Sequence, residues 1–270
     1  MKRANIYPVV LLIGMLCSVS FGFERFPYDS STAGAPSIAI VSQGMTVYTN
    51  PATLAKVQQK TVSFEEGRLY AGVIPGHTLQ YLQPVGRLGT IGINLSSLSA
   101  NDVRYETNSI IFGTSLKTIN IGVKVNQYKV LEQPKIQRAV GYSADFGALV
   151  NLGQYLRVGM IAQDVGSYLK WKGDGTGQPA KEKGSMKVRM GFGLNLSDAS
   201  QIGADYKENG KFAIGVDMRP TEFFGIRFGM DENSPTFGFS LKVSKLFGID
   251  YAYNGSQLGD VQFISTHVSF

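Results

Sequence analysis

The chain has 270 residues and a formal net charge of +6, from 26 Lys and Arg against 20 Asp and Glu. These charges are spread along the sequence without the basic cluster that nucleic-acid binding needs, so we expect no nucleic-acid partner. The single cysteine, Cys17, lies in the N-terminal leader, which excludes disulfides, thiolate nucleophiles and cysteine metal sites from a processed chain.

Residues 1–22 have the pattern of a signal peptide. Lys2 and Arg3 form the charged end, an apolar core runs over residues 9–16, and the small residues Ser18, Ser20 and Gly22 mark the region of cleavage. The apolar core is too short to span a bilayer as a stable helix. An uncleaved anchor is the alternative, which the absence of a stop-transfer pattern disfavours. The leader therefore predicts export.

Residues 23–60 show no regular alternation of apolar and polar side chains. Within this segment Asn50 is placed to cap a short helix, and Pro51 suits that helix's first turn. A helix start is the simple structural interpretation of this motif. Any further role depends on the strands that follow.

From residue 61 onward the dominant period is two, which is typical of β-strands with one apolar face. In residues 187–196, for example, Val188, Met190 and Phe192 alternate with Arg189 and Gly191. Thirty-two glycines, 13 Tyr and 16 Phe also favour strands and turns over helices. We predict fourteen strands, near 61–73, 76–84, 88–98, 109–116, 118–131, 139–150, 155–166, 185–196, 199–207, 210–219, 222–231, 235–244, 246–254 and 259–270.

The connections predict a transmembrane antiparallel β-barrel, an all-β fold. Every second connection is short, whereas several of the others are longer, as at 99–108, 132–138 and 167–184. Short turns at one end, an even strand count and no apolar run long enough for a membrane helix are typical of bacterial outer-membrane barrels. A secreted β-sandwich or solenoid is the alternative, but it lacks a second apolar face to cover the alternating Phe, Ile and Met residues.

A barrel of about fourteen strands is too wide for its own side chains to fill, so we expect residues 23–60 to form an N-terminal plug, or hatch, in the lumen of the 61–270 barrel. Glycines on the inward faces would leave room for it. The polar residues that we expect to face the lumen carry both signs of charge: Lys124, Arg189, Asp217, Arg219, Arg227, Asp231 and Lys242.

Several motifs, in this order, resemble the FadL superfamily of outer-membrane transporters, especially its PorV-like branch. They are Thr32-Ala33-Gly34-Ala35, the hatch motif Asn50-Pro51-Ala52, the strand 141–149, the closing hairpin around 248–253 and the terminal Phe270. Pro36 replaces a residue that is commonly basic in the family, and Thr53 replaces the usual glycine. The modest outer loops also differ from those of fatty-acid transporters.

The resemblance implies a barrel in the bacterial outer membrane that passes small or hydrophobic molecules when the hatch shifts. The alternative that it implies is a non-conducting structural or secretion-accessory barrel that binds partner proteins, such as secretion-system proteins. Outer-membrane lipid and the barrel assembly machinery are the other expected partners, and Phe270 is the expected assembly signal.

Neither catalysis nor a cofactor is indicated. The two histidines, His77 in an expected outer turn and His267 in the last strand, have no accompanying catalytic residues at a recognisable spacing. The Gly-rich stretch 173–177 lacks the Lys-Ser/Thr of a phosphate loop. We therefore expect no enzyme, no metal and no cofactor, and a loop residue and a lumen residue for the two histidines.

Overall fold

The computed structural model describes residues 34–40, 50–132, 137–172, 181–255 and 259–270. The predicted leader, 1–22, and the hatch residues 23–33 and 41–49 lie outside this part of the chain. The described elements are three short 3-10 helices, η1 (Pro51–Lys56), η2 (Gly86–Leu88) and η3 (Glu208–Gly210), and the strands β1 (Thr61–Leu69), β2 (Ile74–Pro84), β3 (Thr90–Ala100), β4 (Val103–Leu116), β5 (Ile119–Glu132), β6 (Gln137–Leu152), β7 (Leu156–Lys172), β8 (Lys181–Lys183), β9 (Lys187–Ser197), β10 (Ser200–Lys207), β11 (Phe212–Met218), β12 (Phe224–Asp231), β13 (Ser234–Lys242), β14 (Phe247–Asn254) and β15 (Val261–Ser269).

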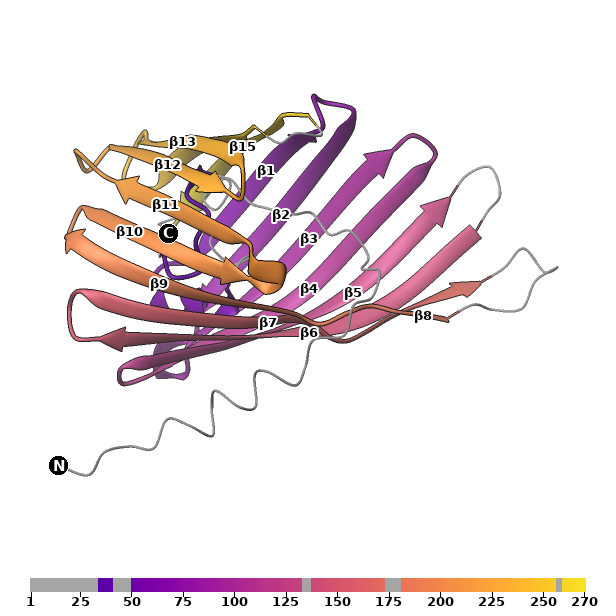
Figure 1. Cartoon of the computed structure of the whole chain (residues 1–270), viewed down its shortest axis with the longest axis horizontal. Coiled ribbons are helices and arrows are strands. Elements are labelled where there is room, and N and C mark those ends of the chain that lie inside the picture. The colour runs from indigo at the N-terminus through magenta and orange to yellow at the C-terminus, as the bar shows by residue number, and fades with distance from the viewer. Residues whose placement is uncertain (1–33, 41–49, 133–136, 173–180, 256–258) are drawn as a thin grey trace.

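These strands form one closed antiparallel sheet (Figure 1). Each long strand pairs with its sequence neighbours, and β1 pairs with β15 from Thr61 opposite Ser269 to Arg68 opposite Gln262, which closes the barrel. The three-residue β8 adds only to the end of β7, so fourteen long strands make the wall. The prediction of a barrel of about fourteen strands is confirmed, because closure leaves no unpaired edge.

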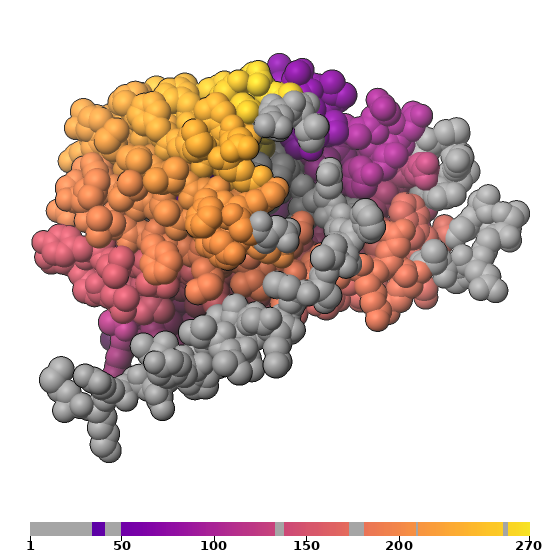
Figure 2. Space-filling model, viewed as in Figure 1, coloured from indigo at the N-terminus to yellow at the C-terminus, as the bar shows by residue number. Residues whose placement is uncertain are grey.

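The wall has an apolar outside, as the alternation predicts. On β4, Ile110 and Phe112 are exposed while Ile111 between them is buried. Figure 2 shows the side chains of β9–β15, orange to yellow, as a continuous outer surface on the visible face. Among the described residues, no helix is long and apolar enough to cross a membrane.

The prediction of longer connections at one end is only partly right. We call the end that carries the start of β1 and the end of β15 the inner end, and the opposite end the outer end. The expected loop 99–108 at the outer end is instead a hairpin, in which Ala100 pairs with Val103 across Asn101 and Asp102. Asn101 adopts a φ of 50°, which suits Asn in a tight turn. Strand β4 therefore begins near residue 103, and β4–β7 extend further at the outer end than β9–β15 (Figure 1).

Strand β7 also runs past its predicted end at residue 166. Its pairing with β6 shifts register between Tyr142 and Phe146, and Asp164 and Gly166 have φ values of 60° and 65°. Such bulges add residues to one strand and break the strict alternation. The period-two pattern therefore stopped short of the true strand end at Lys172.

Candidate functional site

The interior of the barrel holds two segments of the N-terminal region. Residues 34–40 are buried, and η1 packs against the inner faces of β3–β6. Asn50 is fully buried, and its side-chain oxygen accepts a hydrogen bond from the Ala52 amide at 3.0 Å, as the capping motif predicts. Its amide nitrogen donates to the carbonyl oxygens of Ile38 (3.5 Å) and Ala148 (3.3 Å). Asn50 therefore joins both interior segments to β6 of the wall.

The wall accommodates these segments with a glycine belt, one inward glycine on each of ten neighbouring strands. A methyl group added to Gly122 would lie 2.2 Å from the Pro51 carbonyl carbon, and one added to Gly147 would lie 2.1 Å from the Asn50 side-chain oxygen. The belt runs from β3 to β13: Gly92, Gly113, Gly122, Gly147, Gly159, Gly193, Gly203, Gly215, Gly229 and Gly238. At these positions glycine permits the interior segments to lie directly on the strands.

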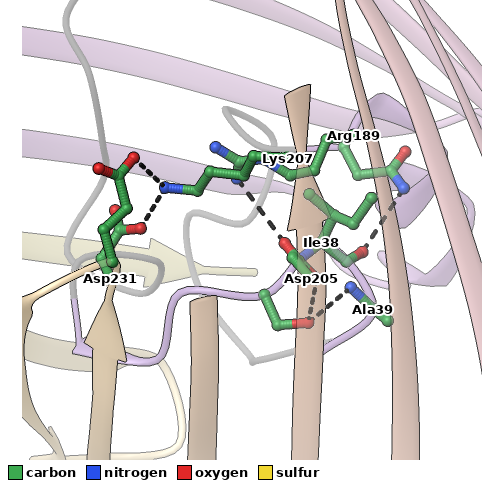
Figure 3. A network of polar contacts seen from close by, with 9 residues as sticks. Ile38, Ala39, Arg189, Asp205, Lys207 and Asp231 are labelled. Carbon is green, nitrogen blue, oxygen red and sulfur yellow. Dashed lines mark hydrogen bonds and ion pairs between the residues drawn. The ribbon is translucent and has the colours of Figure 1, made fainter. Parts of the chain in front are cut away.

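Asp205 on β10 holds the first interior segment (Figure 3). One carboxylate oxygen accepts from the Ser37 hydroxyl at 2.7 Å, and the other accepts from the Ile38 amide at 2.9 Å. Arg189 on β9 lies 3.8 Å from the same carboxylate. Sequence reasoning missed Asp205, although its place on the inward face of the predicted strand 199–207 is the signal that could have identified it.

The predicted lumen residues lie on the inward faces of their strands. Lys124, Asp217, Arg227 and Asp231 are buried, whereas Arg189 and Arg219 are partly exposed and Lys242 is exposed at the inner mouth. The structure does not gather them into one cluster. Instead, opposite charges pair locally: Lys207 on β10 with Asp231 on β12, Arg227 on β12 with Asp250 on β14, and Arg219 with Asp217 at the end of β11.

Part of the outer half of the lumen differs from the polar interior that the sequence predicts. Inward apolar side chains there form two buried clusters, which we call the outer apolar lining, whereas the outer ends of β10 and β12 carry Lys207 and Asp231. Tyr105 and Trp171 pack against these clusters. The lining comprises Leu69, Leu98, Ala252, Val261 and Phe263 in one cluster, and Tyr128, Val130, Ala139 and Leu169 in the other. Several of their outward neighbours are polar, such as Arg68, Ser99 and Lys129, so these strand ends do not show the simple pattern of apolar outward and polar inward residues.

A polar layer lies next to the outer apolar lining. The Tyr128 hydroxyl is 2.7 Å from the Ser143 hydroxyl and donates to Asp164 at 3.1 Å. Asn126 donates to Ser143 and to Asp145, at 3.1 and 3.2 Å. The outer apolar lining is thus bordered by a layer of hydrogen-bonded side chains on β5, β6 and β7.

The two histidines lie on opposite faces of the wall and do not form a pair. His77 is exposed on β2 and stacks on Phe64, with ring centroids 6.1 Å apart, so its prediction as a loop residue is wrong. His267 faces the lumen, as predicted, with Nδ1 3.3 Å from Asp250. Within the described part of the chain, no group of three or more His, Cys, Asp or Glu could hold a metal ion.

A cavity with a volume of about 520 Å³ lies at the inner mouth. It is bounded by Thr53 and residues 56–59, by the inner ends of β12–β15, by the start of β1 and by the turn at 244–247. It therefore lies at the inner ends of two belt strands, β12 and β13, and of their neighbours β14, β15 and β1.

Comparison with known proteins identifies the fold. No protein-family model and no curated protein sequence matches the chain. Among solved structures, it is similar to the CymD monoaromatic hydrocarbon channel, with a TM-score of 0.60 and 14% identity over 90% of this chain and 97% of that one. A deltaS2 mutant of the TodX monoaromatic hydrocarbon channel gives a TM-score of 0.61 at 12% identity, covering 90% and 97%. A FadL homologue of Pseudomonas aeruginosa gives 0.58 at 10% identity, covering 93% and 99%. The chain therefore has the fold that these channels share.

Proposed function

We propose that this protein is a bacterial outer-membrane barrel through which small hydrophobic molecules pass, with residues 23–60 acting as a hatch. The location is supported by the closed wall and its apolar outer face, because in hydrocarbon every backbone polar group must be satisfied internally. Outer-membrane lipid would cover this face. Phe270, which is 58% exposed after β15, would serve as the signal read by the barrel assembly machinery.

The main support for the proposal is the outer apolar lining. Inward apolar side chains such as Leu98, Val130 and Phe263 offer no hydrogen bonds to ions or sugars. Apolar side chains at the outer mouth instead offer a small apolar molecule a place to leave water, at roughly 25 cal/mol for each Å² of apolar surface buried. The shared fold with hydrocarbon channels supports the same substrate class.

The hatch role is supported by the contacts of its described segments. Asn50, with Pro51 and Ala52, sits on the glycine belt in the inner half of the lumen, and Asp205 holds the other segment. A molecule bound at the outer apolar lining could reach the inner end only if these contacts shift. On this proposal the chain belongs with the FadL superfamily, and the PorV-like branch is the expected place within it.

The test combines uptake and conductance. Cells expressing the protein should take up the neutral apolar dye N-phenyl-1-naphthylamine faster than cells without it. Leu98→Ser, which changes the outer apolar lining, should reduce uptake. Leu95→Ser, on the outward face of the same strand, should leave uptake unchanged. Planar-bilayer recordings should show higher conductance after deletion of residues 28–56. Equal uptake by both serine variants, or a silent deletion variant, would refute passage through the lumen.

A second candidate is a non-conducting, secretion-accessory barrel that binds partner proteins. The extension of β4–β7 beyond the shorter strands β10–β12 favours it, because it raises one side of the outer rim. If the native and hatch-deleted proteins are both silent and dye uptake is unchanged, this candidate becomes the better account.

A further inference from the structure

We propose that the cavity at the inner mouth binds a small oxyanion, that is, a carboxylate or phosphate group. This inference does not rest on the proposed passage of hydrophobic molecules, because a barrel that conducts nothing could bind the same anion. It rests on the position of the cavity, on its charge and on the donors that line it.

The position of the cavity follows from the path of the plug. The described plug segments lie on the glycine belt, where η1 contacts β3–β6, whereas the cavity lies at the inner end of the lumen beside the inner ends of β12–β15. Thr53 and residues 56–59, where the chain leaves η1 for β1, form one side of it. Its volume of about 520 Å³ is suited to a small ligand, since such sites typically range from roughly 300 to 1,000 Å³.

The charge of the cavity is positive. Its lining includes four cations, Lys56, Arg219, Lys242 and Lys245, but only two carboxylates, Glu222 and Asp250.

Asp250 contributes little negative potential to the cavity, because its carboxylate is already neutralised in the wall. One oxygen accepts from Arg227 at 2.9 Å and from the Ser240 hydroxyl, and the other lies 3.3 Å from Nδ1 of His267. Arg219 is likewise paired, with Asp217 of the wall, so the three lysines Lys56, Lys242 and Lys245 face one remaining carboxylate, that of Glu222. A concave surface with low-dielectric walls concentrates such a field and attracts anions.

The lining also supplies hydrogen-bond donors. Hydroxyl groups of Thr221, Ser244 and Ser269 and the side-chain amides of Gln58 and Gln59 line the same cavity. Arg219, whose guanidinium is 3.8 Å from Asp217, presents a planar fork suited to a carboxylate or phosphate. Donors combined with excess positive charge favour an oxyanion over a neutral or cationic ligand.

The experiment uses the purified full-length mature protein in zwitterionic detergent. Binding of 4-fluorobenzoate is followed by fluorine NMR, with 4-fluorobenzyl alcohol as a neutral probe of similar shape and inorganic phosphate as a competitor. The test variant combines Arg219→Gln and Lys242→Gln. The matched control combines Arg87→Gln and Lys117→Gln, which remove two cations from inner-end turns that do not line the cavity. Heat-modifiable gel mobility checks that every variant is folded.

We expect 4-fluorobenzoate to bind the native protein, to be displaced by phosphate and to bind at least tenfold more weakly to the test variant, with little change in the control. Binding should weaken with added salt, since partly exposed charges are screened over about 8 Å at 0.15 M. Displacement by nanodiscs containing phosphatidylglycerol, but not by free phosphate, would assign the oxyanion to a lipid headgroup. Equal binding of the acid and the alcohol, or equal loss in the test and control variants, would overturn the proposal.

Discussion

Adding one methyl group to the wall at Gly122 should displace the plug. A Cβ at this position would lie 2.2 Å from the Pro51 carbonyl carbon, 2.3 Å from its oxygen and 2.5 Å from the Ala52 nitrogen. These are backbone atoms, and ordinary contacts begin near 3.4 Å, so no side-chain rotation relieves the overlap. Gly122→Ala therefore forces η1 away from β5.

The cost can be bounded from the behaviour of overpacked interiors. Extra methylene groups in a well-packed core typically cost about 1 to 3 kcal/mol. Because alanine is otherwise at least as favourable as glycine within a strand, this cost falls on the seated plug rather than on the barrel wall. A difference of about 1 to 3 kcal/mol raises the displaced population by roughly 5- to 150-fold.

The assay exploits the absence of cysteine after residue 17. The substitution Ala52→Cys places one thiol at a fully buried position where η1 meets the wall. When reseating is faster than labelling, the rate of reaction with a water-soluble maleimide reports the displaced population. Gly122→Ala should accelerate labelling by the factor given above and raise conductance in planar bilayers.

The matched control is Gly225→Ala, on the inward face of β12. A Cβ there meets Arg219 at 3.5 Å, an ordinary contact, so labelling should match that of the parent protein. If Gly122→Ala also leaves labelling unchanged while the protein remains folded, the inferred packing of the plug on the glycine belt is wrong.

Three further changes test other contacts. Asp205→Ala removes the acceptor of two hydrogen bonds from the plug, each worth roughly 1.5 to 3 kcal/mol. Maleimide labelling in the Ala52→Cys background should therefore be faster with Asp205→Ala than with Asp205→Asn. Equal labelling rates would show that the carboxylate does not hold the plug. Asn50→Ala leaves the Ala52 amide without its hydrogen-bond acceptor at a cost of about 1 to 3 kcal/mol. Brief channel openings in planar bilayers should then become more frequent, and unchanged recordings would show that Asn50 does not hold the plug closed. Deletion of Phe270 should lower the amount of folded protein in the outer membrane without affecting export across the inner membrane; normal assembly would remove its role as a signal.

Much of the wall could be predicted from the sequence because the wall of a β-barrel is a local pattern repeated from strand to strand. Strand alternation is a property of adjacent residues, so segments such as 187–196 could be recognised without any knowledge of their neighbours. The predicted Asn50 cap of a short helix was equally local, and the structure shows that hydrogen bond. The errors arose where local geometry broke the pattern: Asn101 turned the chain two residues after Ser99, and the bulge at Asp164 interrupted β7.

The interior depended on tertiary structure, because it is assembled from residues far apart in the chain. Asp205 meets Ser37 across a separation of 168 residues, and no spacing rule connects them. Likewise, Leu98 and Phe263 meet in the outer apolar lining only after β1 pairs with β15. The glycine belt can be recognised as a contact surface only when the interior segments lie on it. The sequence by itself determined which residues alternate and where short turns can form. The closure of the sheet decided which inward side chains face one another, because contacts across a lumen are set by strand register around the whole barrel.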